Sequence, residues 1–259
     1  MQQAIEALTQ RLTEALGKQM LSLYLYGSAT MDDFHPGWSD IDVLCLTDGR
    51  MPEAQAWELV ELRQQLVQET GNPLCRCIEG AVLSSSEFVS GPCRQVVYWG
   101  TSGERLTNHY EMNAFSRLTL VRYGQCVAGR DIRCLFHRPT MQDLRAATAQ
   151  HLATIRQVAA QTEPSLYSCG WLLDICRCLY TLRTGDILPK TAAGKWALRQ
   201  GLCPVEEELR RTLAVRQEPE KYRNDPPTLA WLSTLGPAVQ RFADVLEEEL
   251  ISQQKAVST

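Results

Sequence analysis

The feature that most constrains the fold is an alternating segment that ends in a Gly-Ser pair. Between residues 21 and 26, leucines alternate with serine and tyrosine, which is the two-residue period of a β-strand. Gly27 and Ser28 follow at once. Glycine lets backbone amides approach a phosphate closely, and the serine hydroxyl adds a further donor. The segment therefore predicts a strand that leads into a loop able to hold a triphosphate.

A second strand is predicted over residues 40–46, after the turn-forming residues His35, Pro36 and Gly37. Its alternation places Asp40 and Asp42 on one face and the apolar residues between and after them on the other. Two neighbouring carboxylates repel each other unless a cation lies between them, and Mg²⁺ binds carboxylate oxygens together with substrate phosphates. We therefore predict Asp40 and Asp42 as metal ligands.

Each of these features also has a simpler interpretation. Gly27-Ser28 could be an ordinary turn at the end of a strand, and Asp40 and Asp42 could be a solvated strand face. A strand, a Gly-Ser turn and then a strand with two aspartates form an ordered pattern that chance matches far less often. The combination favours nucleotidyl transfer.

This pattern resembles the DNA polymerase beta-like nucleotidyltransferase superfamily, and more closely the bacterial aminoglycoside adenylyltransferases that modify streptomycin and spectinomycin. In that family a third acidic residue lies on a later strand, and residues 77–84 look like that strand. The resemblance implies that Glu79 is the catalytic base, acting together with the catalytic residues Asp40 and Asp42. The residues alone also allow a Glu79 that only pairs with Arg76 or Arg94.

The resemblance extends into the second half of the chain. Residues 174–180, 184–186 and 189–196 look like the helical domain of those enzymes. The resemblance implies that Arg177 and Lys190 bind the triphosphate of ATP, alongside the Gly-Ser turn. Without the resemblance, the lysine is most simply a solvated side chain near a helix start.

Two positions depart from the family pattern. The acid and the histidine that contact the drug in the family fall on Tyr167 and Gly170 here, and neither side chain replaces a carboxylate. Glu163 or Asp174 could take that place instead, although Asp174 could equally form a buried ion pair with Arg177. The identity of the acceptor therefore stays open.

The composition narrows the class of protein. The chain has 259 residues, of which 44% are hydrophobic and 22% charged, enough for two compact domains. A net charge of −4 argues against a nucleic-acid partner. No signal-like or membrane-spanning apolar segment is apparent, so we expect a cytoplasmic protein without a membrane partner, and ten cysteines that form no disulfides.

The predicted fold combines an α/β part with an all-α part. Helices over residues 5–16 and 52–70 flank the strands, and we expect a mixed β-sheet in a nucleotidyltransferase domain over residues 1–138. Residues 84–138 are hard to interpret, although residues 98–100 and 105–110 are possible walls of an acceptor pocket. Residues 139–259 are expected to form a helical bundle that binds substrate and nucleotide, with helices at about 141–161, 166–184, 190–200, 205–217 and 228–253.

Together these features predict a monomeric Mg²⁺-dependent nucleotidyltransferase that moves AMP from ATP to a hydroxyl of a small acceptor. An aminoglycoside-type antibiotic is the acceptor that the resemblance implies, with antibiotic resistance as the role. One alternative is an adenylyltransferase that acts on a protein hydroxyl. Another is a nucleotide sensor without turnover, although such a protein would not need all of Asp40, Asp42 and Glu79.

Overall fold

The computed structural model describes residues 1–257, which fold into two compact units. The first unit contains Met1–Phe34 and Ser39–Arg138. The second contains the short segment His35–Trp38 and the chain from Pro139 onward. The substrate- and nucleotide-binding roles that we assigned to the second half stay predictions.

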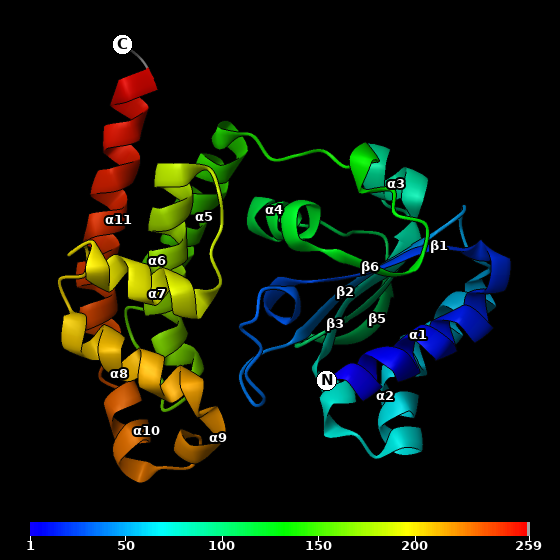
Figure 1. The fold of residues 1–259 in the computed structure, drawn as a ribbon, viewed down its shortest axis with the longest axis horizontal. Coiled ribbons are helices and arrows are strands. Elements are labelled where there is room, and N and C mark those ends of the chain that lie inside the picture. The colour runs from blue at the N-terminus through cyan, green and yellow to red at the C-terminus, as the bar shows by residue number, and fades with distance from the viewer. Residues whose placement is uncertain (258–259) are drawn as a thin grey trace. The chain divides into compact units, whose positions relative to one another are not determined.

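A six-stranded sheet forms the centre of the first unit, with strand order β5-β4-β3-β2-β1-β6 (Figure 1). β2 and β3 pair in parallel and every other neighbouring pair is antiparallel, so the predicted mixed sheet is confirmed. The strands are β1 Met20–Tyr26, β2 Ile41–Thr47, β3 Ile78–Ser84, β4 Val96–Gly100, β5 Gly103–Thr107 and β6 Gln125–Gly129.

Helices cover both faces of this sheet (Figure 1). The alternation in β1 sends Leu23 and Leu25 into one core, which they share with α1 (Gln2–Leu16) and α2 (Glu53–Thr70). Tyr24 and Tyr26 point into the other core, beside α3 (Ser85–Ser90) and α4 (Ala114–Tyr123). The segment that the sequence left uninterpreted therefore supplies β4 to β6, α3 and α4.

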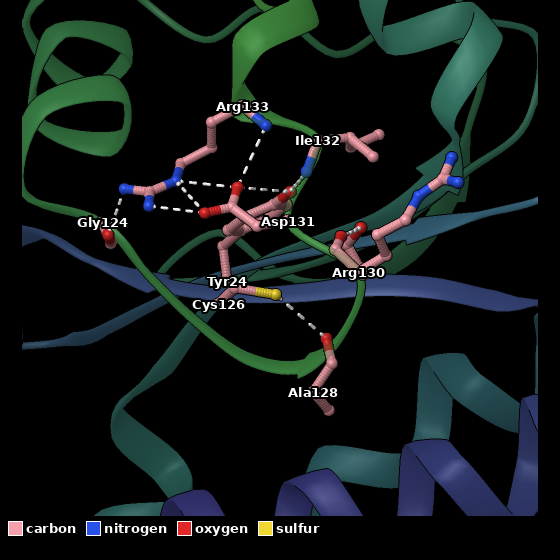
Figure 2. Close-up of polar contacts among 9 residues, drawn as sticks. Tyr24, Gly124, Cys126, Ala128, Arg130, Asp131, Ile132 and Arg133 are labelled. Atoms are coloured by element: carbon pink, nitrogen blue, oxygen red, sulfur yellow. Dashed lines mark hydrogen bonds and ion pairs between the residues drawn. The ribbon is translucent and has the colours of Figure 1, made fainter.

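A polar network fastens the chain that leaves β6 onto β1 (Figure 2). The Tyr24 hydroxyl accepts a hydrogen bond from the Ile132 amide at 2.7 Å. Arg133 Nη2 lies 2.6 Å from Asp131 Oδ2, and Nη1 of the same guanidinium donates to the carbonyl of Gly124. The bond from Arg133 lowers the pKa of Asp131 to about 2, so the pair is fully charged at neutral pH.

The second unit is helical, as predicted. Helix α6 packs against α5, α7, α8 and α11, and most of its residues are buried, as its largely apolar sequence requires. Thr140 and Asp143 form a capping box at the start of α5. The helices are α5 Met141–Val158, α6 Tyr167–Thr184, α7 Lys190–Arg199, α8 Glu206–Gln217, α9 Pro219–Tyr222, α10 Pro226–Leu232 and α11 Gly236–Val257.

The single helix predicted over residues 228–253 is wrong. The chain breaks into α10 and α11 at residues 233–235, where the Ser233 and Thr234 hydroxyls donate to the carbonyls of Ala230 and Trp231. These local hydrogen bonds compete with the helical ladder, and Pro237 lacks the amide that an uninterrupted helix would need. The apolar spacing alone did not reveal the break.

Two further observations bear on the composition. Within residues 1–257, none of the helices has the length and apolar character needed to cross a membrane. All ten cysteines are free thiols, and most of them are buried.

Candidate active site

The register of β1, β2 and β3 places three candidate site residues at neighbouring positions across the sheet. Asp42 on β2 is the register partner of Tyr26 on β1, and it is also the partner of Glu79 on β3. Both carboxylates are half-buried, and Asp40, one residue before β2, is half-buried too. The parallel pairing of β2 and β3 is what brings the two acids from separate segments of the chain together.

Gly27 lies directly against the Asp42 carboxylate. Its φ is +71°, and a Cβ at this position would lie 1.9 Å from Asp42 Oδ2. Only glycine can occupy such a backbone conformation at such a short separation without strain. Ser28, in the turn that follows, donates through Oγ to the carbonyl of Asp40 at 3.4 Å. The predicted phosphate turn and the predicted metal ligands are therefore in one place.

A tyrosine that the sequence did not single out for catalysis holds Glu79. The Tyr98 hydroxyl on β4 donates to Glu79 Oε1 at 3.1 Å. Burial and the nearby Glu79 charge raise the pKa of Tyr98, so the phenol keeps its proton and remains a donor. Glu79 thus has a tyrosine partner from the neighbouring strand. Trp99, the next residue, is fully buried and donates to the carbonyl of Leu59, so it belongs to the core instead of an acceptor pocket.

Two more tyrosines lie on the Asp42 side. Burial raises the pKa of Tyr26 well above its usual value, and Tyr110, which is hydrogen-bonded to it, has a raised pKa for the same reason. The charge of Asp42 adds to both effects. These phenols are neutral hydrogen-bonding groups beside the carboxylates. An aromatic residue ending the first strand was the one signal in the sequence that pointed to Tyr26.

The donor set fits Mg²⁺ bound by carboxylates together with substrate phosphates. In the part of the chain that the structure describes, no three His, Cys, Asp or Glu side chains lie close enough to hold a metal. Asp40 precedes the strand, whereas Asp42 and Glu79 are strand neighbours. Carboxylate oxygens and phosphate oxygens are both ligands that this ion prefers, so the residues present suit it.

The second unit holds the other two predicted nucleotide ligands. Lys190 Nζ, at the start of α7, lies 3.1 Å from Asp174 Oδ1 on α6. His151 Nε2 is 3.8 Å from the other oxygen of Asp174, and burial lowers the pKa of His151, which favours its neutral form. Burial opposes ionisation of Asp174, but Lys190, His151 and Arg177 hold its pKa below the usual range. Lys190 is therefore an ion-pair partner of Asp174.

Arg177 lies on α6, three residues after Asp174. Its Nε is buried and has no hydrogen-bond partner among the described residues, which leaves a donor available on this guanidinium. Arg177 adds to the charge around Asp174, while the close contact of Asp174 is with Lys190.

The positions that depart from the family pattern lie beside the segment His35–Trp38. Tyr167 is 74% exposed and lines a pocket of about 320 Å³, together with Trp38 and Arg223. Gly170 is buried, and a Cβ there would make ordinary contact with the Trp38 ring. Trp38 in turn lies 5.3 Å from the guanidinium of the buried Arg216. This pocket has aromatic and cationic walls, and no carboxylate is among the lining residues that the structure describes.

Comparison with known proteins decides the family. Residues 5–75 match the nucleotidyltransferase domain family, and residues 135–226 match the C-terminal domain of aminoglycoside adenylyltransferases. The chain belongs to the aminoglycoside adenylyltransferase family. It is an enzyme, an adenylyltransferase, as predicted.

Curated relatives of this family member are spectinomycin 9-adenylyltransferases. The protein from Campylobacter jejuni is 28% identical over 70% of this chain and 71% of its own length. The protein from Staphylococcus aureus strain Mu50 is 25% identical over 76% of this chain and 77% of its own length. A crystal structure of spectinomycin adenyltransferase AAD(9) from Enterococcus faecialis with ATP and spectinomycin superposes with a TM-score of 0.70 and 16% identity. It covers 95% of this chain and 99% of its own, so the two proteins share a fold.

Proposed function

We propose that this adenylyltransferase moves AMP from ATP to a hydroxyl of an aminoglycoside-type antibiotic in a Mg²⁺-dependent reaction. The observation that carries the proposal is the placement of Gly27, Asp42 and Glu79 at one end of β1, β2 and β3. A turn without side-chain bulk next to two carboxylates suits a phosphate chain and a hydroxyl nucleophile.

In this proposal Glu79 acts as general base. It removes the proton from the acceptor hydroxyl, the oxygen attacks the α-phosphorus of ATP, and pyrophosphate leaves with the electrons of the broken P–O bond. Asp40 and Asp42 would hold Mg²⁺, which when bound neutralises charge on the phosphate oxygens. Gly27 and Ser28 would bind the phosphates through backbone and hydroxyl donors.

Arg177 and Lys190 would bind the triphosphate as further cationic ligands. Support comes from the donor that Arg177 has available and from the position of Lys190 at the first residue of a helix, where backbone amides also favour anions. In the absence of nucleotide, Asp174 balances the charge of Lys190. We further propose that the enzyme works as a cytoplasmic monomer.

The first experiment is pyrophosphate release with Mg²⁺-ATP across spectinomycin, a panel of aminoglycosides, lincosamides and a cell extract. The Asp42→Asn variant serves as the blank. Spectinomycin is the first acceptor to test, because the curated relatives carry its name. Release with one antibiotic supports the proposal. Release with extract alone would favour a protein hydroxyl, and silence with retained ATP binding would favour a nucleotide sensor.

A further inference from the structure

The hydrogen bond between Tyr98 and Glu79 carries an inference that rests on the proposed function. Tyr98 belongs to β4, which pairs antiparallel with β3, the strand of Glu79. Its hydroxyl donates to Oε1 of Glu79 at 3.1 Å. We propose that Tyr98 is a positioning residue, which fixes the Glu79 carboxylate so that Oε2 faces the acceptor hydroxyl.

The Tyr98 ring is held in place by a guanidinium stacked on its face. The guanidinium of Arg105, its cross-strand partner on β5, lies 4.2 Å from the ring centroid. Arg105 Nη1 also donates to Ser102 Oγ at 2.9 Å, which fixes the guanidinium itself. A cation stacked on an aromatic face restricts both side chains. The phenol is therefore an ordered donor.

Gly100 makes the contact between the two side chains possible. A Cβ at this position would lie 2.2 Å from the Tyr98 hydroxyl oxygen and 2.7 Å from Glu79 Oε1. Any larger residue would therefore displace one or both of the bonded atoms. In the sequence Tyr98-Trp99-Gly100, the first residue contacts Glu79 and the second packs in the core. Gly100 leaves the space that the contact between Tyr98 and Glu79 requires.

The backbone under the pair is fixed from the α2 side of the sheet. Arg63 donates to the carbonyl of Ile78 at 3.0 Å and to the carbonyl of Gly100 at 3.2 Å. It also forms an ion pair of 2.7 Å with Glu104, and both of these side chains are largely buried. Arg63 thus holds the backbone of β3 just before Glu79 and the backbone of β4 two residues after Tyr98. Such bonding restrains β3 and β4 against sliding.

The hydrogen bond has a direct chemical consequence. A protonated phenol can only donate to a carboxylate, so Oε1 is engaged and its rotation is restricted. A base already aligned with its substrate loses less entropy on reaching the transition state than a freely rotating one. Tyr98 thus raises the turnover number while contributing nothing to ATP binding.

The test is steady-state kinetics of Tyr98→Phe with Mg²⁺-ATP and the acceptor identified in the release assay. The ring and its contact with Arg105 stay, and only the hydroxyl is lost. We expect kcat to fall roughly ten- to hundredfold, as misalignment of a catalytic group does. The KM for ATP should stay within about twofold of the parent value. An unchanged kcat would overturn the proposal, as would a loss confined to the KM for ATP.

Tyr24→Phe is the matched control, because it removes a buried phenol hydroxyl from the same sheet, on the Asp131 network of Figure 2. We expect it to lower thermal stability and to leave kcat unchanged. A comparable fall of kcat in this control would mean that loss of sheet stability, not loss of positioning, explains Tyr98→Phe.

A double-variant cycle separates this inference from the proposed function. With Glu79→Gln already present, Tyr98→Phe should change kcat less than about twofold, because the residue acts through Glu79. A further fall of about tenfold would show that Tyr98 acts on something else and would overturn the inference. If Glu79→Gln alone retains full turnover, the proposed general base is wrong, whereas an inactive Glu79→Gln with a fully active Tyr98→Phe defeats only the positioning role.

Discussion

Gly27 and Asp42 are so close that a methyl group on Gly27 would lie 1.9 Å from Asp42 Oδ2. The turn that is proposed to bind phosphate and the carboxylate that is proposed to bind metal therefore form one unit. A side chain added at Gly27 would therefore displace the Asp42 carboxylate.

The first prediction is that Gly27→Ala lowers kcat by at least about a hundredfold, because the added methyl displaces the Asp42 carboxylate. Gly49→Ala is the control. Its φ is +84°, and a Cβ there meets nothing within 4 Å among the described residues. It therefore carries a similar backbone strain, of roughly 1–2 kcal/mol, without the collision. Turnover and thermal midpoint should be measured for both variants. Equal turnover in the two would show that the contact has no role.

Asp42→Asn should abolish metal-dependent turnover with the fold intact. An amide of the same shape keeps the packing but provides a weaker metal ligand, and the stabilisation of phosphate oxygens by the ion is worth several kcal/mol. We expect kcat to fall roughly a thousandfold, with a thermal midpoint within a few degrees of the parent. Turnover measured as a function of Mg²⁺ concentration checks the loss of activity, and thermal unfolding followed by circular dichroism checks the midpoint. Parent-like activity at low Mg²⁺ would contradict the assignment.

In the second unit, Lys190→Met should raise the KM for ATP about tenfold and affect kcat less, since a point charge on the triphosphate is lost. Lys195→Met, on the same helix but with an exposed side chain, is the control and should behave as the parent. ATP affinity measured by calorimetry gives the direct readout. Equal affinity in both variants would exclude Lys190 from the nucleotide site.

A fourth prediction concerns acid stability. Because Arg133 lowers the pKa of Asp131 from 3.8 to about 2, the pair contributes stability above about pH 4 and loses it as the pH falls through 2. Asp131 is 44% exposed, so we expect only about 0.5–1 kcal/mol. The Asp131→Asn variant should therefore be less stable at pH 7, with a difference from the parent that shrinks below pH 4. Urea unfolding at several pH values measures this, and a pH-independent difference would rule it out.

The sequence predicts the strands that carry the site better than the rest of the first unit. β1 and β2 have clear alternation, and the resemblance to a known family placed Glu79 on a later strand. The structure shows that this strand, β3, is the neighbour of β2. β4, β5 and β6 have only five residues each, too few for a periodic signal. The places of β5 and β6 at the sheet edges, and of β4 between β5 and β3, follow from tertiary packing alone.

The contacts of individual side chains were less accessible. Tyr98 reaches Glu79 through the register of β3 and β4, and no local pattern encodes that register. One alternative from the sequence paired Asp174 with Arg177 on its own helix, whereas the close contact is Lys190 on the next helix. Spacing along one helix reports which residues share a face, but not which helix packs against that face.

The segment His35–Trp38 gives the two units an unusual connectivity. The chain passes from one unit to the other after Phe34, after Trp38 and after Arg138. A fragment cut at Pro139 would lack the tryptophan that stacks on Arg216, and would leave that buried cation facing a gap. A chimaera of two relatives joined at Pro139 would therefore combine the helical part of one relative with residues 35–38 of the other. For a chimaera to work, this tetrapeptide must be inherited together with the C-terminal half, although it lies far upstream in the sequence.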